Sequence, residues 1–133
     1  MDERRPVVRI GTSLAALEMI QSGTTTFADM YYFEEEIARA TKAAGLRAVL
    51  GQTIIRFPVP DAKTPEEELA RTERFINAFK GDPLITPALA PHAPFTVSAD
   101  HLRQARALAT ELGLPILIHV SETKDELRQV AER

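Results

Sequence analysis

The chain has 133 residues, 44% of them hydrophobic and 26% charged, with a formal net charge of −3, which is the composition of one ordinary globular domain. Acidic and basic residues are mixed along the sequence, so no basic stripe for nucleic acid is present, and the absence of cysteine excludes disulfides and thiolate metal sites. No apolar run could cross a membrane and the charged start is unlike a signal peptide, so we expect a cytoplasmic protein without a membrane partner.

Apolar periodicity and glycine or proline stop signals divide the chain into alternating helices and strands. In chain order the pattern predicts a helix that ends before Gly23, a strand over residues 24–28, a helix over 34–44, a strand over 46–50, a helix from Thr64 until Gly81, a strand over 84–90, a helix over 99–112, a strand over 115–120 and a last helix that opens at Thr123. Thr64 and Thr123 start capping boxes. The acidic runs 34–36 and 66–68 are expected to be solvated helix starts, where the helix dipole favours them.

Four short apolar strands separated by single helices predict βαβ units and a parallel sheet. Right-handed crossovers would place the helices on one side of that sheet. The predicted fold class is therefore α/β, a partial (β/α) barrel of about four parallel strands, with residues 1–133 as one domain. Its inner face and its two open edges need a partner, so we expect a homodimer or a higher oligomer.

Functional groups in parallel α/β folds gather at the carboxyl ends of the strands. Asp29, His92, His119 and Glu122 satisfy this condition. A histidine at the end of a strand can bind zinc, and a carboxylate three residues later can move the proton of a metal-bound water. The alternative is a hydrogen-bonded histidine at a strand end followed by a glutamate in the first turn of a helix.

The other candidates have two interpretations each. His92 lies between Pro91 and Pro94, and a loop stiffened in this way suits either a substrate contact or a turn histidine that packs on Phe95. Asp29 either accepts a hydrogen bond from a residue of the site or is simply the polar end of a strand. His101, in the first turn of a helix, is expected to be structural. Neither a glycine-rich phosphate loop nor a G-x-S-x-G elbow occurs.

Three segments of the chain resemble the amidohydrolase superfamily. They are LEMIQSGTTTFADMY at residues 17–31, LAPHAPFTVS at 89–98 and IHVSET at 118–123, in the order found in that family. The resemblance is greatest to the S-adenosylhomocysteine/5′-methylthioadenosine deaminases, with the triazine chlorohydrolases and guanine deaminases nearby. The three segments correspond to the second, fourth and fifth strands of a (β/α)₈ barrel, and the chain would cover strands two to five.

This resemblance implies a hydrolase that holds one divalent metal, zinc or iron, and uses metal-activated water against C–N or C–Cl bonds of a purine- or triazine-like small molecule. It implies that His119 is a metal ligand, that Glu122 is the catalytic proton shuttle and that His92 binds the substrate. The family also draws a His-x-His pair from its first strand, a histidine from its sixth and an aspartate from its eighth.

The sequence departs from that pattern because no His-x-His occurs and residues 1–12 are an unmatched N-terminal extension. One imidazole with one or two carboxylates falls short of the three protein ligands of catalytic zinc. We therefore expect the isolated chain to bind zinc negligibly and to be inactive. The alternatives are a non-catalytic half-barrel that serves as a structural or oligomerising module, and a small-molecule binder that has lost its metal.

Overall fold

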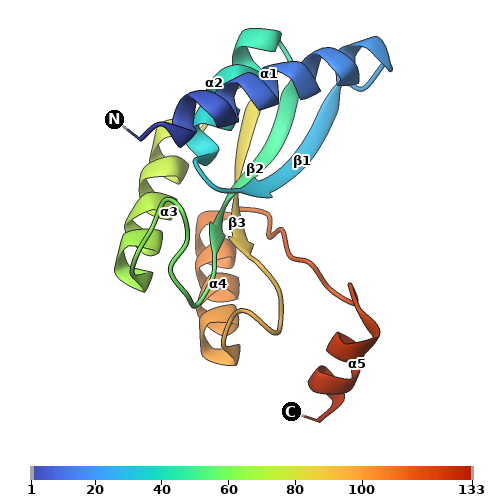
Figure 1. Ribbon diagram of the computed structural model, residues 1–133. Helices are drawn as coiled ribbons and strands as arrows, with labels where there is room; N and C mark the ends of the chain where they lie inside the picture. The colour runs from blue at the N-terminus through green and yellow to red at the C-terminus, as the bar shows by residue number, and fades with distance from the viewer. Residues whose placement is uncertain (1, 133) are drawn as a thin grey trace.

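The computed structural model describes residues 2–132, apart from the side chain of Pro65. In chain order its elements are α1 (Arg4–Gln21), β1 (Thr26–Tyr31), α2 (Glu34–Ala44), β2 (Arg47–Ile54), α3 (Pro65–Phe79), β3 (Ile85–Pro91), α4 (Ala99–Leu112) and α5 (Lys124–Ala131). The three strands pair in parallel in the order β1-β2-β3, as Figure 1 shows. The predicted α/β class with parallel strands is confirmed.

Alternate residues of the strands pack against the helices. One core cluster joins α2, β2, α3 and β3 through Ile37, Ala38, Ala48, Leu50, Phe75 and Ile85. A second cluster joins Ile76 of α3 and Leu89 of β3 to Ala105 and Ala109 of α4. The strand residues between these face the other side of the sheet. There Gly51 is required, because a Cβ on it would lie 2.5 Å from the Cβ of Ala90.

The predicted fourth strand, over residues 115–120, is an extended segment that runs parallel to β3. The amide of Leu89 donates to Pro115 at 3.0 Å and the amide of Leu117 donates to Leu89 at 2.9 Å. The next bond of a parallel ladder would come from residue 91, but Pro91 has no N–H. The following bond shifts instead to His92, whose carbonyl accepts from His119 at 2.9 Å. One proline therefore reduces the expected strand to a single bridge.

Helix α1 begins at Arg4, within the predicted extension over residues 1–12, and packs along α2, with Val8 against the first core cluster. Its outward face carries an apolar row at helical spacing, with large hydrophobic side chains that are roughly half to two-thirds exposed: Val7, Ile10, Leu14, Leu17 and Ile20. The predicted extension over residues 1–12 thus continues into α1. The predicted domain bounds include residues 1 and 133, which lie outside the described residues.

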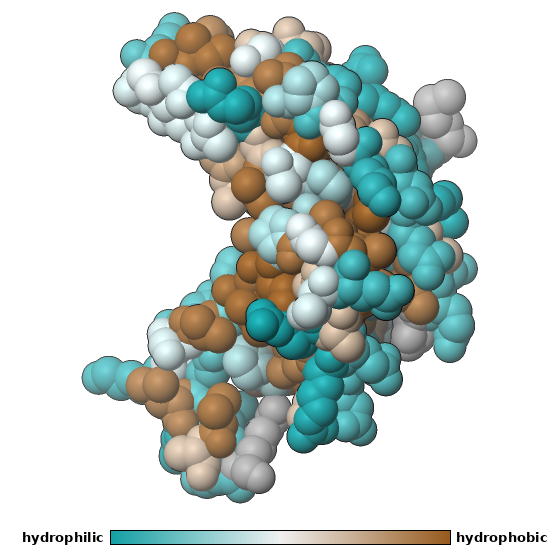
Figure 2. All heavy atoms as spheres, turned by 180° about the vertical axis from the view of Figure 1, so that it is seen from behind, coloured by the Kyte–Doolittle hydropathy of each residue, from teal (hydrophilic) through white to brown (hydrophobic). Residues whose placement is uncertain are grey.

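The chain leaves α4 through a long connection and ends in α5, which lies apart from the other helices (Figure 1). Leu127 of α5 is 57% exposed and Val130 is 47% exposed. Figure 2 shows a crescent outline with hydrophobic side chains along its concave side. The strand-end region is therefore open on one side.

Within residues 2–132, no helix combines the length and apolarity needed to span a bilayer.

Candidate functional site at the carboxyl end of the sheet

Two histidine rings meet at the carboxyl end of β3. The ring centroids of His92 and His119 are 5.2 Å apart, and the rings are nearly perpendicular at 77°. The backbone brings them together, because the His119 amide donates to the His92 carbonyl and the His92 amide donates to Ile54 at 3.0 Å. His119 is exposed and His92 is partly buried. The two strand-end histidines of the sequence are therefore neighbours in space.

The ring of His92 is held on two sides. Its Nδ1 lies 2.8 Å from the hydroxyl of Thr96, and the ring meets Phe95 edge-on with centroids 6.4 Å apart. The packing on Phe95 that the sequence suggested is thus present. Neither contact uses Nε2, which makes no hydrogen bond with a described residue. An oriented ring with one free nitrogen is suited to hold a polar group of a ligand.

Electrostatics keep this site from accumulating positive charge. Burial lowers the pKa of His92, the neighbouring His119 lowers it further, and the carboxylate of Glu122 acts in the opposite direction. A lowered pKa favours the neutral imidazole, which can accept a hydrogen bond or donate a lone pair.

The turn that carries Glu122 is organised by a buried glutamate. Glu126, which is 3% exposed, accepts from the amides of Ser121 at 3.0 Å and Glu122 at 2.7 Å. Thr123 completes the predicted cap by accepting from the amide of Glu126 at 3.1 Å. Ser121 takes a left-handed conformation with φ of 58°, a strained state for a residue other than glycine. The exposed side chain of Glu122 therefore projects from a fixed backbone.

The residues present do not fit a complete zinc site. Catalytic zinc takes three protein ligands and an open position. Within residues 2–132, no group of three histidine, cysteine, aspartate or glutamate side chains is placed to hold a metal ion. The paired imidazoles of His92 and His119 have no carboxylate or third imidazole close enough to complete a set.

Asp29 belongs to a different part of the molecule. Its side chain lies on the same face of β1 as Phe27, and both line a hollow with Val8 and Met19 of α1. Burial raises the pKa of its carboxyl. Asp29 is therefore a half-buried carboxyl beneath α1.

The prediction that the acidic runs are solvated helix starts is wrong for three residues. Glu34 is fully buried, Glu68 is 3% exposed and Glu36 is 7% exposed. Neither carboxylate oxygen of Glu34 has a hydrogen-bond partner of good geometry. Burial raises its pKa well above the usual range, and nearby Asp29 adds to that increase. The helix starts are covered because α1 and the connection before α3 fold over them.

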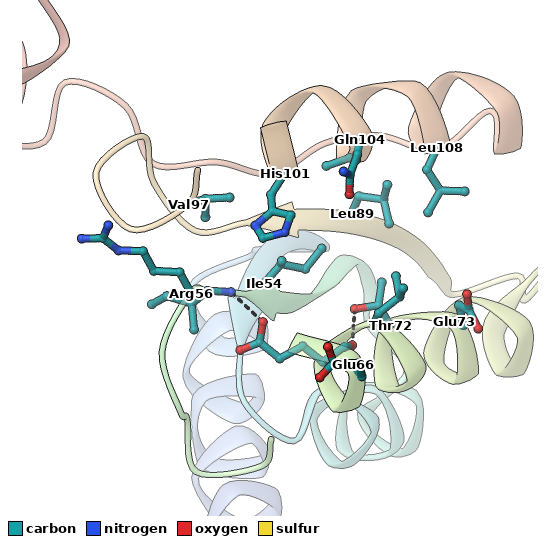
Figure 3. Close-up of a pocket in the computed structure, with 14 residues that line it drawn as sticks. Ile54, Arg56, Glu66, Thr72, Glu73, Leu89, Val97, His101, Gln104 and Leu108 are labelled. Carbon is teal, nitrogen blue, oxygen red and sulfur yellow. Dashed lines mark hydrogen bonds between the residues drawn. The ribbon is translucent and has the colours of Figure 1, made fainter. Parts of the chain in front are cut away.

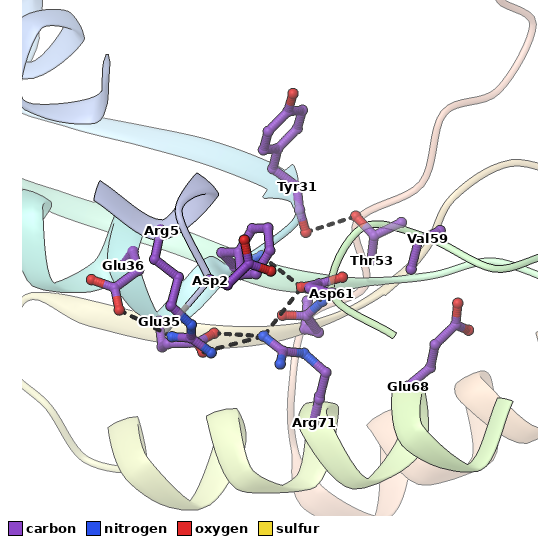
Figure 4. Close-up of polar contacts among 12 residues, drawn as sticks. Asp2, Arg5, Tyr31, Glu35, Glu36, Thr53, Val59, Asp61, Glu68 and Arg71 are labelled. Atoms are coloured by element: carbon purple, nitrogen blue, oxygen red, sulfur yellow. Dashed lines mark hydrogen bonds and ion pairs between the residues drawn. The ribbon is translucent and has the colours of Figure 1, made fainter. Parts of the chain in front are cut away.

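A polar network that the sequence did not reveal joins these helix starts to the connection before α3. Asp61 accepts from the amide of Phe33 at 2.6 Å and the side chain of Gln52 at 2.9 Å, and it pairs with Arg71 at 3.2 Å. Arg71 also pairs with Glu35 at 3.0 Å (Figure 4). The partners of Asp61 lie just before α2, in β2 and in α3, which no local pattern could identify.

A parallel sheet with helices on one face and a histidine pair at its carboxyl end is the arrangement of (β/α)-barrel enzymes. The profile of the Amidohydrolase family matches residues 7–133, and the chain belongs to that family. The predicted superfamily is thus confirmed.

Curated relatives are similar over almost the whole chain. A 5-methylthioadenosine/S-adenosylhomocysteine deaminase of Aquifex aeolicus is 48% identical over 126 residues, which are 95% of this chain and 29% of that protein. The corresponding deaminase 1 of Syntrophus aciditrophicus is 48% identical over 92% of this chain and 28% of its own length. The chain therefore spans less than a third of the curated relatives it matches.

Solved structures of deaminases also superimpose on almost the whole chain. An adenosine deaminase from Xanthomonas campestris with bound zinc superimposes with a TM-score of 0.92 at 36% identity, covering 97% of this chain and 29% of that one. A guanine deaminase from C. acetobutylicum gives a TM-score of 0.83 at 20% identity over 96% of this chain and 33% of its own, a likeness in fold alone. The partial-barrel interpretation is consistent with both.

Proposed function

We propose that this chain supplies one portion of the active-site mouth of a metal-dependent deaminase that acts on C–N bonds of purine-like small molecules, with C–Cl bonds of triazine-like rings as the related chemistry. The observation that carries the proposal is the contact between His92 and His119 in a chain that is 48% identical to 5-methylthioadenosine/S-adenosylhomocysteine deaminases. Small-molecule purines are therefore the first substrates to test.

Each candidate residue has a role that its environment supports. The exposed imidazole of His119 offers a lone pair to a divalent metal, zinc or iron, that other segments would help to hold. Glu122 projects from a fixed turn and is the proposed proton carrier. His92 is oriented by Thr96 and Phe95, so its free Nε2 is the proposed contact to substrate.

The isolated chain is proposed to be inactive, because its own side chains fall short of a metal site. Within residues 2–132, no set of three metal-ligating side chains is present to support a metal-dependent step. The roles of His92, His119 and Glu122 must therefore be tested where the remaining ligands are present.

A chimera provides that test. The matching segment of the Aquifex aeolicus relative, 126 residues at 48% identity, is replaced by this chain, and ammonia release from 5′-methylthioadenosine is measured together with bound metal. We expect the chimera to be active. His119→Ala should lose metal and activity together, whereas Glu122→Gln should keep metal and lose activity by about 100-fold or more. His92→Ala should mainly raise KM.

His101→Ala is the matched control, because His101 is an exposed histidine of α4 away from the His92–His119 contact. It should leave metal content and activity unchanged. An active chimera in which His119→Ala retains full metal content and rate would contradict the assignment. A folded chimera with metal but no activity would contradict the proposed substrate class.

We also propose that the chain forms homodimers or higher oligomers through its open sheet edges and inner face. The exposed apolar row of α1, including Ile10 at 69% exposure and Leu14 at 58%, is a further apolar surface that self-association would cover. Light scattering at micromolar concentration should give at least twice the monomer mass of 14.7 kDa. A clean monomer would contradict it. Leu14→Lys should weaken the association, with the exposed polar position Glu18→Lys as control.

A non-catalytic half-barrel module is the second candidate. It is favoured by the absence of any three-residue metal set within residues 2–132 together with the exposed row on α1. An inactive but folded chimera, combined with a stable oligomer of the chain alone, would favour this candidate over the first.

A further inference from the structure

A groove of about 460 Å³ lies between α3 and α4, on the helix-covered side of the sheet. Its apolar surface includes Leu69 of α3. Leu89 of β3 and Leu108 of α4, labelled in Figure 3, also line it. All of its lining residues belong to consecutive elements, from the end of β2 to α4. The groove is therefore formed by neighbouring elements of the described chain, and its volume is in the range of small-molecule pockets.

The charges that line the groove are predominantly negative. Glu66, Glu68 and Glu73 come from α3, whereas α4 contributes His101 and Gln104, and Arg56 is the only lysine or arginine in the lining. In Figure 3 the guanidinium of Arg56 extends away from Gln104 and Leu108. An apolar groove with carboxylates along one wall is complementary to a ligand that joins an apolar body to a positive charge.

Glu68 is the residue best placed to meet that charge. It is 3% exposed, and its Oε2 accepts from the amide of Ile55 at 3.0 Å. Its Oε1 accepts no hydrogen bond from the residues that the structure describes, although the residue lines the groove. Figure 4 shows Glu68 apart from the ion pair between Asp61 and Arg71, so that pair does not neutralise it directly.

Burial raises the pKa of Glu68 to about 7, and nearby Asp61 adds to the increase. A cation in the groove would favour the ionised carboxylate and would replace the solvation that burial removes. A charge-assisted hydrogen bond to a buried carboxylate is stronger than a neutral one.

We propose that the groove between α3 and α4 binds a small organic cation, an aryl or alkyl group that carries one protonated amine. The ammonium pairs with Glu68, and the apolar body packs between Leu69 and Leu108. Neither His92 nor His119 lines this groove, so its binding can be tested separately from the proposed deaminase role.

Tryptamine is a suitable probe, and tryptophol is its neutral control of nearly the same size. The chain contains no tryptophan, so indole fluorescence reports the probe alone. Tryptamine should bind the 133-residue chain saturably with a Kd below about 1 mM, and tryptophol about tenfold more weakly. Amide chemical-shift changes should map to α3 and α4. Equal binding of the two probes, no saturable binding of tryptamine, or shifts confined to other elements would overturn the proposal.

Two variants test the walls of the groove. Glu68→Gln keeps an oxygen that can accept from Ile55 and should weaken tryptamine about tenfold without changing tryptophol. Leu69→Ala removes a side chain that is 48% exposed, so folding should be preserved while both probes bind several-fold more weakly. Glu111→Gln and Leu112→Ala, on exposed positions of α4 outside the groove, are the matched controls and should bind as the parent does. Unchanged tryptamine binding in folded Glu68→Gln would contradict the proposed ammonium contact.

Discussion

The helix-covered side of the sheet and the strand-end edge that leads to α5 differ in how completely the chain covers its own apolar residues. Leu50 and Leu89 are fully buried between strands and helices, whereas Val120 is 60% exposed and Leu127 is 57% exposed. The same residue type therefore contributes differently to stability in the two regions. The apolar residues of the first region form a buried core, whereas those of the second region are exposed.

The largest expected effect is the contrast between two leucines. Leu50→Ala should lower the free energy of unfolding by about 3 kcal/mol, because it empties a fully buried position in the first core cluster. Leu127→Ala should change it by less than about 0.5 kcal/mol, because the side chain is already mostly in water. Urea unfolding followed by circular dichroism measures both. Equal losses in the two variants would show that α5 is packed in solution, and dilution would reveal whether an oligomer packs it.

A second prediction concerns Glu34, whose buried carboxyl is an exception among the apolar residues on the helix-covered side of the sheet. Glu34 has a pKa well above its usual range in the folded state because it is buried near Asp29. Above pH about 4.5 the unfolded chain releases this proton while the folded chain keeps it, so stability should fall as pH rises until the folded group also ionises. Glu34→Gln should remove this fall and add about 1–2 kcal/mol at pH 8.

Glu35→Gln is the matched comparison for Glu34. Glu35 pairs with Arg5 and Arg71, and its pKa is lowered, so its contribution has the opposite sign and should be lost as pH falls. Stability measured by urea unfolding between pH 3 and 9 separates the two, because the effect of Glu35 falls below pH about 4.5 and that of Glu34 above it. Parallel pH profiles for the parent and Glu34→Gln would contradict the burial of an unpartnered carboxyl.

The sequence predicted the elements best where a cap or a stop signal acts locally. The predicted bounds of α2, with Gly45 behind it, and of α4, between Ser98 and Gly113, agree with the structure because caps are determined by neighbouring residues. The strand-end rule also anticipated that His92 and His119 lie close together. These features depend on spacing alone.

The features that sequence analysis missed depend on residues far apart in the chain. The acidic runs at the starts of α2 and α3 look solvated locally, but α1 and Asp61 cover them. The strand over residues 115–120 has a strong apolar pattern, and it fails to form a ladder because Pro91 of its neighbour lacks an amide. The roles of His92, His119 and Glu122 remain predictions, because no third ligand lies beside the histidines within residues 2–132.

The smallest predicted effect compares two helix caps of the same type. Ser98 accepts from the amide of His101 at 3.2 Å in α4, and Thr123 accepts from Glu126 at 3.1 Å in α5. Ser98→Ala should lower global stability by about 1 kcal/mol. Thr123→Ala should leave the global midpoint unchanged and speed amide exchange within α5 alone. A global loss in Thr123→Ala would show that α5 unfolds together with the sheet.

The most direct test of the central claim, that this chain carries part of a deaminase mouth without a metal site of its own, is a zinc titration of the metal-free protein by calorimetry. We predict no one-to-one binding with a Kd below about 1 µM, because His92 and His119 lack further ligands within residues 2–132. Tight one-to-one binding that His119→Ala abolishes would contradict the claim and would show that the chain completes the site by itself.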